Sequence, residues 1–153
     1  MSPAQMARLH AASFPRGWSE TEIKDLLAKP TTLLVTNTHG FALLQSIPPE
    51  AELLTIVIDP ASRGHGHGKT LLTQTLAIAT AHGANTVFLE VDATNTPALN
   101  LYKAAQFTRT GLRRAYFEHP DGTRSDAITM TCPTPGTMTC PTPGTMARSS
   151  PGK

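Results

Sequence analysis

The sequence predicts a single α/β domain built on a mixed sheet, and three consecutive stretches carry that prediction. Residues 53–58 are apolar and rich in β-branched side chains, as is typical of a buried strand. A glycine-rich stretch and a helical pattern follow, and then a second strand pattern at 86–91. Two strands joined through a helix form a right-handed, parallel βαβ unit. Because ligands of open α/β sheets bind beyond the carboxyl ends of the strands, the glycine-rich stretch is the expected site region.

The elements before this unit follow from periodicity and from end signals. A weak apolar stripe predicts a helix over 3–13. Ser19, with Glu22 three residues later, forms a capping box that begins a second helix, which Pro30 ends. Residues 31–36 and 40–47 predict a hairpin around the turn at 37–40, and the Pro-Pro pair at 48–49 leads into the strand at 53–58.

The elements after the glycine-rich stretch complete the domain. Helical spacing begins at Lys69 and ends before Gly83. A short helix is expected from Thr96 as its cap, with Pro97 at the first position, to about residue 105. Two strands, 112–118 and 125–130, form a last hairpin turned at 120–122.

The end of the chain has a different composition from the rest. The octapeptide Thr-Met-Thr-Cys-Pro-Thr-Pro-Gly occurs at 129–136 and is repeated at 137–144. Two copies are too few for a repeat fold, and each contains two prolines and a glycine. We therefore expect a folded domain over 1–132 and a disordered tail over 133–153.

Composition narrows the functional classes. A net charge of +2 over 153 residues does not favour nucleic acid as a partner. No apolar run approaches the ~20 residues of a membrane span, and no secretory signal precedes the domain. The two cysteines, at 132 and 140, lie in or next to the tail and form no disulfide framework, so a reducing cytoplasm is the expected location. The sequence does not determine the oligomeric state.

The glycine-rich stretch has three alternative explanations besides an unliganded surface turn. Gly68-Lys69-Thr70 suggests a nucleotide P-loop, but Arg63 occupies the position where that motif needs glycine. Glycines at alternate positions do not fit the dinucleotide fingerprint either. The third pattern, Arg/Gln-x-x-Gly-x-Gly/Ala, is matched by Arg63, Gly66 and Gly68. His65 and His67 have a spacing that metals use, but no third ligand accompanies them, so no metal is expected.

The third pattern resembles the acetyl-CoA pyrophosphate loop of the GNAT superfamily, and about 120 residues resemble its RimI-like, ribosomal-protein alanine N-acetyltransferase family. The resemblance implies the GNAT fold: a mixed, mostly antiparallel sheet with a central, splayed pair of parallel strands. The matching residues occur in the family's order: Phe14-Pro15, Trp18-Ser19-Glu20 after two inserted residues, Ile58-Asp59-Pro60, Leu89-Glu90-Val91, Asn95, Leu101-Tyr102, Phe107, Arg113 to Tyr116, Asp121-Gly122 and Asp126-Ala127.

The resemblance also implies residue roles. Glu90 is the expected general base and Tyr102 the expected general acid for direct transfer of acetyl from acetyl-CoA to an amine. The expected contacts to acetyl-CoA are the backbone of Ile56, Val57 and Ile58, the loop residues Arg63, Gly64, His65, Gly66, His67, Gly68 and Lys69, and Asn95. Trp18 and Tyr116 are weaker candidates for contact with the acceptor.

The chemistry is consistent with a protein N-terminus as the acceptor. An amine attacks a thioester only when it is unprotonated, so a carboxylate must accept its proton. An α-amino group has a pKa of about 7.7–8.0, against about 10.4 for lysine. Deprotonation at neutral pH therefore costs roughly 1 kcal/mol for the first and more than about 4 kcal/mol for the second.

Other interpretations remain open at this point. Glu90 also fits the pattern of an outward-facing strand residue, and Tyr102 fits that of an aromatic that anchors its helix in the core. Trp18 and Tyr116, the candidates for contact with the acceptor, also fit ordinary core aromatics. The closest enzyme alternative acetylates a lysine or a small amine, and a non-catalytic CoA-binding module is a third possibility.

Two departures from the family pattern stand out. The family's first strand, ahead of the first helix, is absent from this sequence, which leaves a sheet edge uncovered. Gln106 replaces the glycine expected before Phe107. The helix is expected to end here with a residue in the left-handed conformation, which destabilises the fold by about 1 kcal/mol when that residue is not glycine.

Overall fold

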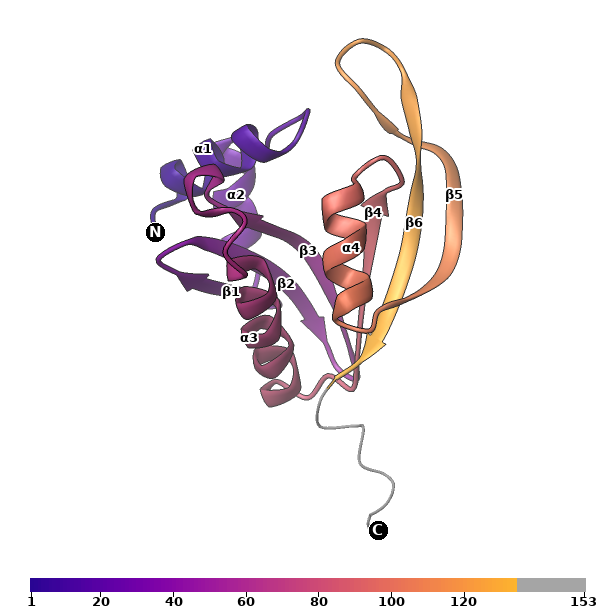
Figure 1. Ribbon diagram of the computed structural model, residues 1–153. Coiled ribbons are helices and arrows are strands. Elements are labelled where there is room, and N and C mark those ends of the chain that lie inside the picture. The colour runs from indigo at the N-terminus through magenta and orange to yellow at the C-terminus, as the bar shows by residue number, and fades with distance from the viewer. Residues whose placement is uncertain (135–153) are drawn as a thin grey trace.

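The computed structural model describes residues 1–134 as four α-helices and six strands that form one sheet (Figure 1). In chain order the elements are α1 (Pro3–Ser13), α2 (Glu20–Leu27), β1 (Thr32–Asn37), β2 (Gly40–Ile47), β3 (Glu50–Ile58), the 3₁₀ turn η1 (Pro60–Ser62), α3 (His67–Ala81), β4 (Thr86–Asp92), α4 (Thr96–Ala104), β5 (Thr108–Glu118) and β6 (Arg124–Pro133).

The sheet is mostly antiparallel, with strand order β1-β2-β3-β4-β6-β5. Its single parallel pair, β3 and β4, is the predicted βαβ unit around α3. The two strands pair only from Glu50 to Glu52, opposite Thr86 to Phe88, and beyond this point β3 keeps β2 as its only partner. The strands therefore separate towards their carboxyl ends, as Figure 1 shows, and the splayed pair implied by the family resemblance is confirmed.

Helices cover the two faces of the sheet and form two hydrophobic clusters. On one face, Met6 of α1 and Ile23 of α2 pack with Phe41, Leu43 and Val57. On the other face, α3 and α4 pack against alternate residues of β4, which are Val87, Leu89 and Val91. The alternation of β4 therefore places Glu90 on the face opposite to α3 and α4.

A β-bulge lies in β3 where the parallel pair ends. Leu43 of β2 pairs with Thr55 and Leu44 with Leu53, so Leu54 is an additional residue on β3. Consistent with this bulge, Leu53 packs in the α3–α4 cluster and Val57 in the α1–α2 cluster, although both positions are odd-numbered. The sequence pattern gave no signal for this reversal of faces.

Most predicted elements are confirmed, and their ends differ by a few residues. Strand β3 begins at Glu50, earlier than expected, because backbone pairing extends it. Helix α3 begins at His67, also earlier than expected, because the left-handed Gly66 is its N-cap. The expected cap of the short helix was wrong: Asn95, not Thr96, is the N-cap of α4, and its side chain accepts the N–H of Ala98.

The last described residues lie just past the predicted domain boundary at 132. Pro133 lies in β6, and the hydroxyl of the buried Thr134 donates to the Ala84 carbonyl. The rest of the predicted tail, residues 135–153 with the second octapeptide, lies outside the described residues. Within residues 1–134, no helix is long and apolar enough to cross a membrane.

The cap of α4 gives a test of backbone strain. Gln106 has the left-handed φ of 71° that the departure from the family's glycine predicts. We expect Gln106→Gly to raise the free energy of unfolding by about 1 kcal/mol, because glycine adopts this conformation without steric cost. Urea unfolding measures the change. The matched control, Ala104→Gly within α4, should lower stability by a similar amount, and a destabilised Gln106→Gly variant would contradict the assignment.

Candidate active site

The glycine-rich loop connects the end of β3 to the start of α3. Gly64 and Gly66 have left-handed φ values of 85° and 80°, and among the described residues a Cβ built at either position would meet no atom within 4 Å beyond the neighbouring residues in the chain. His67, Gly68 and Lys69 form the first turn of α3, whose N–H groups have no partners within a helix. Open glycines next to a helix N-terminus provide the backbone donors and the positive dipole end that a phosphate needs.

Arg63 connects the glycine loop to α1. Its Nε donates to the carbonyl of Ile58 at 3.2 Å, and its Nη2 donates to Ser13 Oγ at 2.6 Å. The exposed guanidinium therefore joins the end of β3 to the last residue of α1, which directly precedes the loop that carries Trp18.

The end of β3 lies beside the glycine loop. Ile56 and Ile58 pack towards α3 and α4, whereas Val57 is 2% exposed and packs towards α1 and α2. None of the three pairs with β4, so within residues 1–134 no strand pairs with this edge of the segment. Thr55, at the bulge, is buried, and its hydroxyl has no hydrogen-bond partner among the described residues. An unpartnered buried hydroxyl is costly, by about 1–3 kcal/mol, and therefore uncommon.

Helix α4 approaches the glycine loop at Gly68. A Cβ at this position would lie 3.7 Å from Leu101 of α4 and 3.8 Å from Ile58 of β3. Asn95 lies at the N-terminal end of α4, where its side-chain oxygen accepts the Ala98 N–H at 3.3 Å. The amide nitrogen of Asn95 is free of this capping bond.

Glu90 lies in a group of charged residues on the face opposite to α4. Its Oε2 accepts from Arg113 Nε on β5 at 2.9 Å, and its side chain is 21% exposed. Glu52 on β3 pairs laterally with Phe88, two residues before Glu90, so the two carboxylates share one face. Burial raises the pKa of Glu52, the charge of Glu90 raises it further, and Arg113 opposes the shift.

Tyr102 lies on the other side of β4. It is 7% exposed within the α3–α4 cluster, and its ring packs against Phe107 with 5.7 Å between ring centroids. Burial raises the pKa of Tyr102 well above its usual value near 10, so the phenol stays protonated at neutral pH. Glu90 and Tyr102 therefore lie on opposite faces of β4.

Trp18 is held by a buried histidine. His10 is 3% exposed, and its ring stacks on Phe14 at 4.4 Å and on Trp18 at 4.3 Å between centroids. The backbone N–H of Trp18 donates to His10 Nδ1 at 3.0 Å. The His10 ring thus fixes the loop between α1 and α2.

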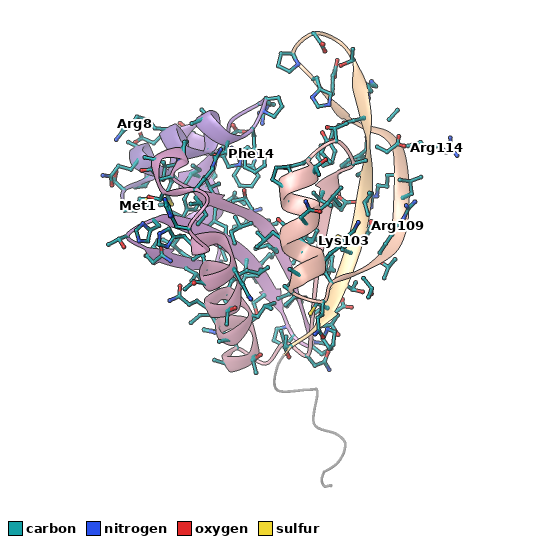
Figure 2. The ribbon with its side chains drawn as sticks, viewed as in Figure 1. Met1, Arg8, Phe14, Lys103, Arg109 and Arg114 are labelled. Carbon is teal, nitrogen blue, oxygen red and sulfur yellow. The ribbon has the colours of Figure 1, made fainter. Side chains whose placement is uncertain are left out.

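Tyr116 is presented by a second bulge, in β5. Between Arg113 and Phe117 the strand has two residues more than its partner β6, and Ala115 has a left-handed φ of 52°. The carboxylate of Asp126 accepts the Ala115 N–H at 2.8 Å and holds the bulge. Tyr116 is 46% exposed, and the guanidinium of Arg113 lies 5.1 Å from its ring centroid. In Figure 2, Arg114 points away from the sheet beyond β5.

The structure divides the predicted residues between the two faces of the sheet. On the α3–α4 face, Ile56, Ile58 and Tyr102 lie near the glycine loop. Val57 lies on the α1–α2 face, and Glu90 and Tyr116 both contact Arg113. Sequence reasoning gave no role to Glu52, Thr55, Arg113 or His39, whose placement depends on pairing between distant strands. Within residues 1–134 no group of three or more His, Cys, Asp or Glu side chains could hold a metal ion.

Comparisons with known proteins identify the family to which this chain is similar. The model of the Acetyltransferase (GNAT) family matches residues 4–107. Curated relatives include the [ribosomal protein bS18]-alanine N-acetyltransferase of Haemophilus ducreyi, which is 37% identical over 61% of this chain and 65% of that protein. The N-alpha-acetyltransferase RimI of Mycobacterium tuberculosis is 41% identical over 60% of this chain and 54% of that protein.

Solved structures share the fold over a larger part of the chain. The crystal structure of the ribosomal-protein-S18-alanine N-acetyltransferase from Escherichia coli matches with a TM-score of 0.76 and 31% identity, covering 86% of each chain. Ard1 from Thermoplasma volcanium, at 24% identity and a TM-score of 0.75, shares the fold over 88% of this chain and 94% of that chain.

The splayed sheet and the glycine loop define an acyl-CoA N-acyltransferase fold, and the family match makes the assignment specific. This chain belongs to the Acetyltransferase (GNAT) family. The matched segment covers 65% and 54% of the lengths of the two curated relatives described above.

The buried His10 gives a prediction for the pH dependence of stability. Burial and then the charge of Arg16 lower its pKa from 6.5 to about 4, with Glu22 opposing. Between these two values the unfolded chain binds a proton that the folded chain does not, so stability falls as pH falls from 6.5 towards 4. We expect a loss of about 2 kcal/mol after a discount for solvent screening, measured by urea unfolding.

The variant His10→Gln, whose amide oxygen can still accept the Trp18 N–H, should lose most of this pH dependence. The exposed His82 provides the control, since His82→Gln should leave the wild-type pH profile intact. An equally steep profile in His10→Gln would show that another group is responsible.

Proposed function

We propose that this protein transfers an acetyl group from acetyl-CoA to the α-amino group of a protein N-terminus, with a ribosomal protein as the target. The observation that carries the proposal is the free edge of β3, which runs beside the glycine loop, with Tyr102 on one face of the sheet and Glu90 on the other. The printed names of the relatives support the choice of acceptor. A cytoplasmic location fits such a target.

The residues present fit acetyl-CoA as a substrate. The open glycines and the first turn of α3 would bind the pyrophosphate, and the unpaired backbone of residues 56–58 would bind the pantetheine arm. The unpartnered hydroxyl of Thr55 lies on β3 next to this segment and offers one further polar group. Acetyl-CoA supplies an acetyl group already activated as a thioester.

The two candidate catalytic residues would act from opposite faces of the sheet. Glu90 accepts a proton from the acceptor ammonium, directly or through water, and the free amine forms the new N–C bond. As the C–S bond breaks, the Tyr102 phenol donates a proton to the leaving thiolate, and the second proton lost by the attacking nitrogen restores the phenol through water. Arg113, whose side chain is 61% exposed, balances the charge of Glu90 and can exchange this ion pair for contact with the acceptor at little cost.

The substrate test compares two peptides of one sequence by the rate of CoA release from acetyl-CoA. One peptide has a free N-terminal alanine and no lysine, and the other has a blocked N-terminus and one internal lysine. We expect at least tenfold faster release with the free N-terminus, because its amine is the easier one to deprotonate at neutral pH. A preference for the lysine peptide would overturn the proposed acceptor, and binding of acetyl-CoA with no release would favour a non-catalytic module.

The catalytic roles are tested by Glu90→Gln and Tyr102→Phe. Each should lower kcat by about 10²–10⁴-fold, the usual contribution of a positioned acid or base, while the Kd of acetyl-CoA stays within about twofold. The control is Glu50→Gln, at the exposed start of β3. Unchanged kcat in Glu90→Gln would remove this residue from the mechanism and leave acetyl-CoA binding unaffected.

A further inference from the structure

Three histidines lie together at the glycine loop, although two distant parts of the chain supply them. His65 and His67 belong to the loop and to the first turn of α3, whereas His39 comes from the turn between β1 and β2. The rings of His39 and His67 are stacked, with 3.5 Å between centroids and 18° between planes, and the His65 ring centroid lies 6.2 Å from that of His67.

The β1–β2 turn holds His39 in this position by several hydrogen bonds. The Asn37 side chain accepts the backbone N–H groups of His39 and Gly40. The backbone N–H of Asp59, at the end of β3, donates to the His39 carbonyl at 2.7 Å. The His39 ring also contacts Ser62 Oγ through Nδ1 at 3.2 Å. The stack is therefore built on a fixed turn.

The stacked arrangement opposes protonation when no anion is present. Partial desolvation lowers the pKa of His67, and the neighbouring His39 and His65 lower it further. The charged groups of the surrounding elements include Asp59, whose carboxylate accepts the Ala61 N–H, Arg63, which reaches Ser13, and Lys69 in the first turn of α3. On the α1 side, Arg8 and the N-terminal Met1 line a depression with Asn37, Thr38 and Asp59, so they place positive charge near the β1–β2 turn. Two like charges at this separation repel strongly, so an anion beside the cluster would be needed to favour the protonated form.

We propose that His39, His65 and His67 form a protonatable phosphate-binding cluster that takes up protons when the phosphoryl groups of acetyl-CoA bind. The inference rests on the proposed function and adds His39, from outside the loop motif, to the cofactor site. Histidine is the side chain whose charge changes near neutral pH, so the cluster makes affinity for the phosphates depend on pH. Neutral rings add no charge to the loop beyond that of Arg63 and Lys69, and protonated rings add charge-assisted hydrogen bonds to the bound phosphates.

The sign of the pH dependence follows from linkage. A bound anion raises the affinity of the cluster for protons, so binding takes up protons and becomes tighter as pH falls through the histidine range. If the bound form holds one proton about ten times more tightly than the free form, affinity rises about fivefold from pH 8 to pH 6.

The test is isothermal titration calorimetry of the full chain at pH 6, 7 and 8, in the presence of EDTA and in buffers with different ionisation enthalpies. The probes are acetyl-CoA and dephospho-CoA. Dephospho-CoA lacks the 3′-phosphate, a group that itself titrates near neutral pH. We expect uptake of about 0.5 proton at pH 7 and about fivefold tighter binding at pH 6 than at pH 8. Proton uptake with both probes indicates that the histidines bind the pyrophosphate. Proton uptake that occurs with acetyl-CoA alone and depends on the histidines indicates that they bind the 3′-phosphate.

The variants His39→Gln and His67→Gln should each reduce proton uptake and flatten the pH profile, whereas the matched control His82→Gln, at the far end of α3, should keep both. Histidine ring signals followed by NMR in the wild-type chain give a second readout, in which ring titrations move to higher pH on binding. Binding without proton uptake, or uptake that persists in both variants, would overturn the inference and leave the proposed function in place. Absence of binding by either probe at every pH would instead contradict the proposed function.

Discussion

The separation of β3 from β4 is the constraint on which the rest of the structure depends. The two parallel strands pair over three residues each and then diverge, because β3 continues with β2 and β4 with β6. Within a sheet, backbone groups are normally paired, so the free edge of β3 is a place where a ligand can take the role of a missing strand. The bulge at Leu54 lies at the point of divergence, next to the buried Thr55, whose hydroxyl has no hydrogen-bond partner within residues 1–134.

The alternation of β4 and the packing of α4 on one face divide the candidate catalytic residues between the two faces of the sheet. Tyr102 is buried in the α3–α4 cluster, and this burial raises the pKa of its phenol. Glu90 lies on the other face, which also carries Arg113 and the exposed Tyr116. Arg63 connects the two sides, because it joins the loop proposed for the cofactor to the last residue of α1, next to the loop with Trp18.

Predictions from the sequence succeeded where the signal is local. The capping box of Ser19 and Glu22 and the left-handed Gln106 are both present, because neighbouring residues determine such features. The cap of α4 was wrong, since Asn95 and Thr96 are both good cap residues and only the path of the chain after β4 selects between them. The bulge at Ala115 depends on Asp126 from the next strand and has no local signal.

The sequence by itself determined the order of helices and strands, the glycine loop between β3 and α3, and the family whose residues occupy matching positions. Periodicity, caps and turn residues act within a few positions, so they can be read along the chain. Only the tertiary structure decided that Glu52 lies beside Glu90, that Arg113 pairs with Glu90, and that His39 stacks on His67. These contacts join strands and turns distant in sequence, and their geometry depends on sheet register and bulges, which one residue of slippage would change.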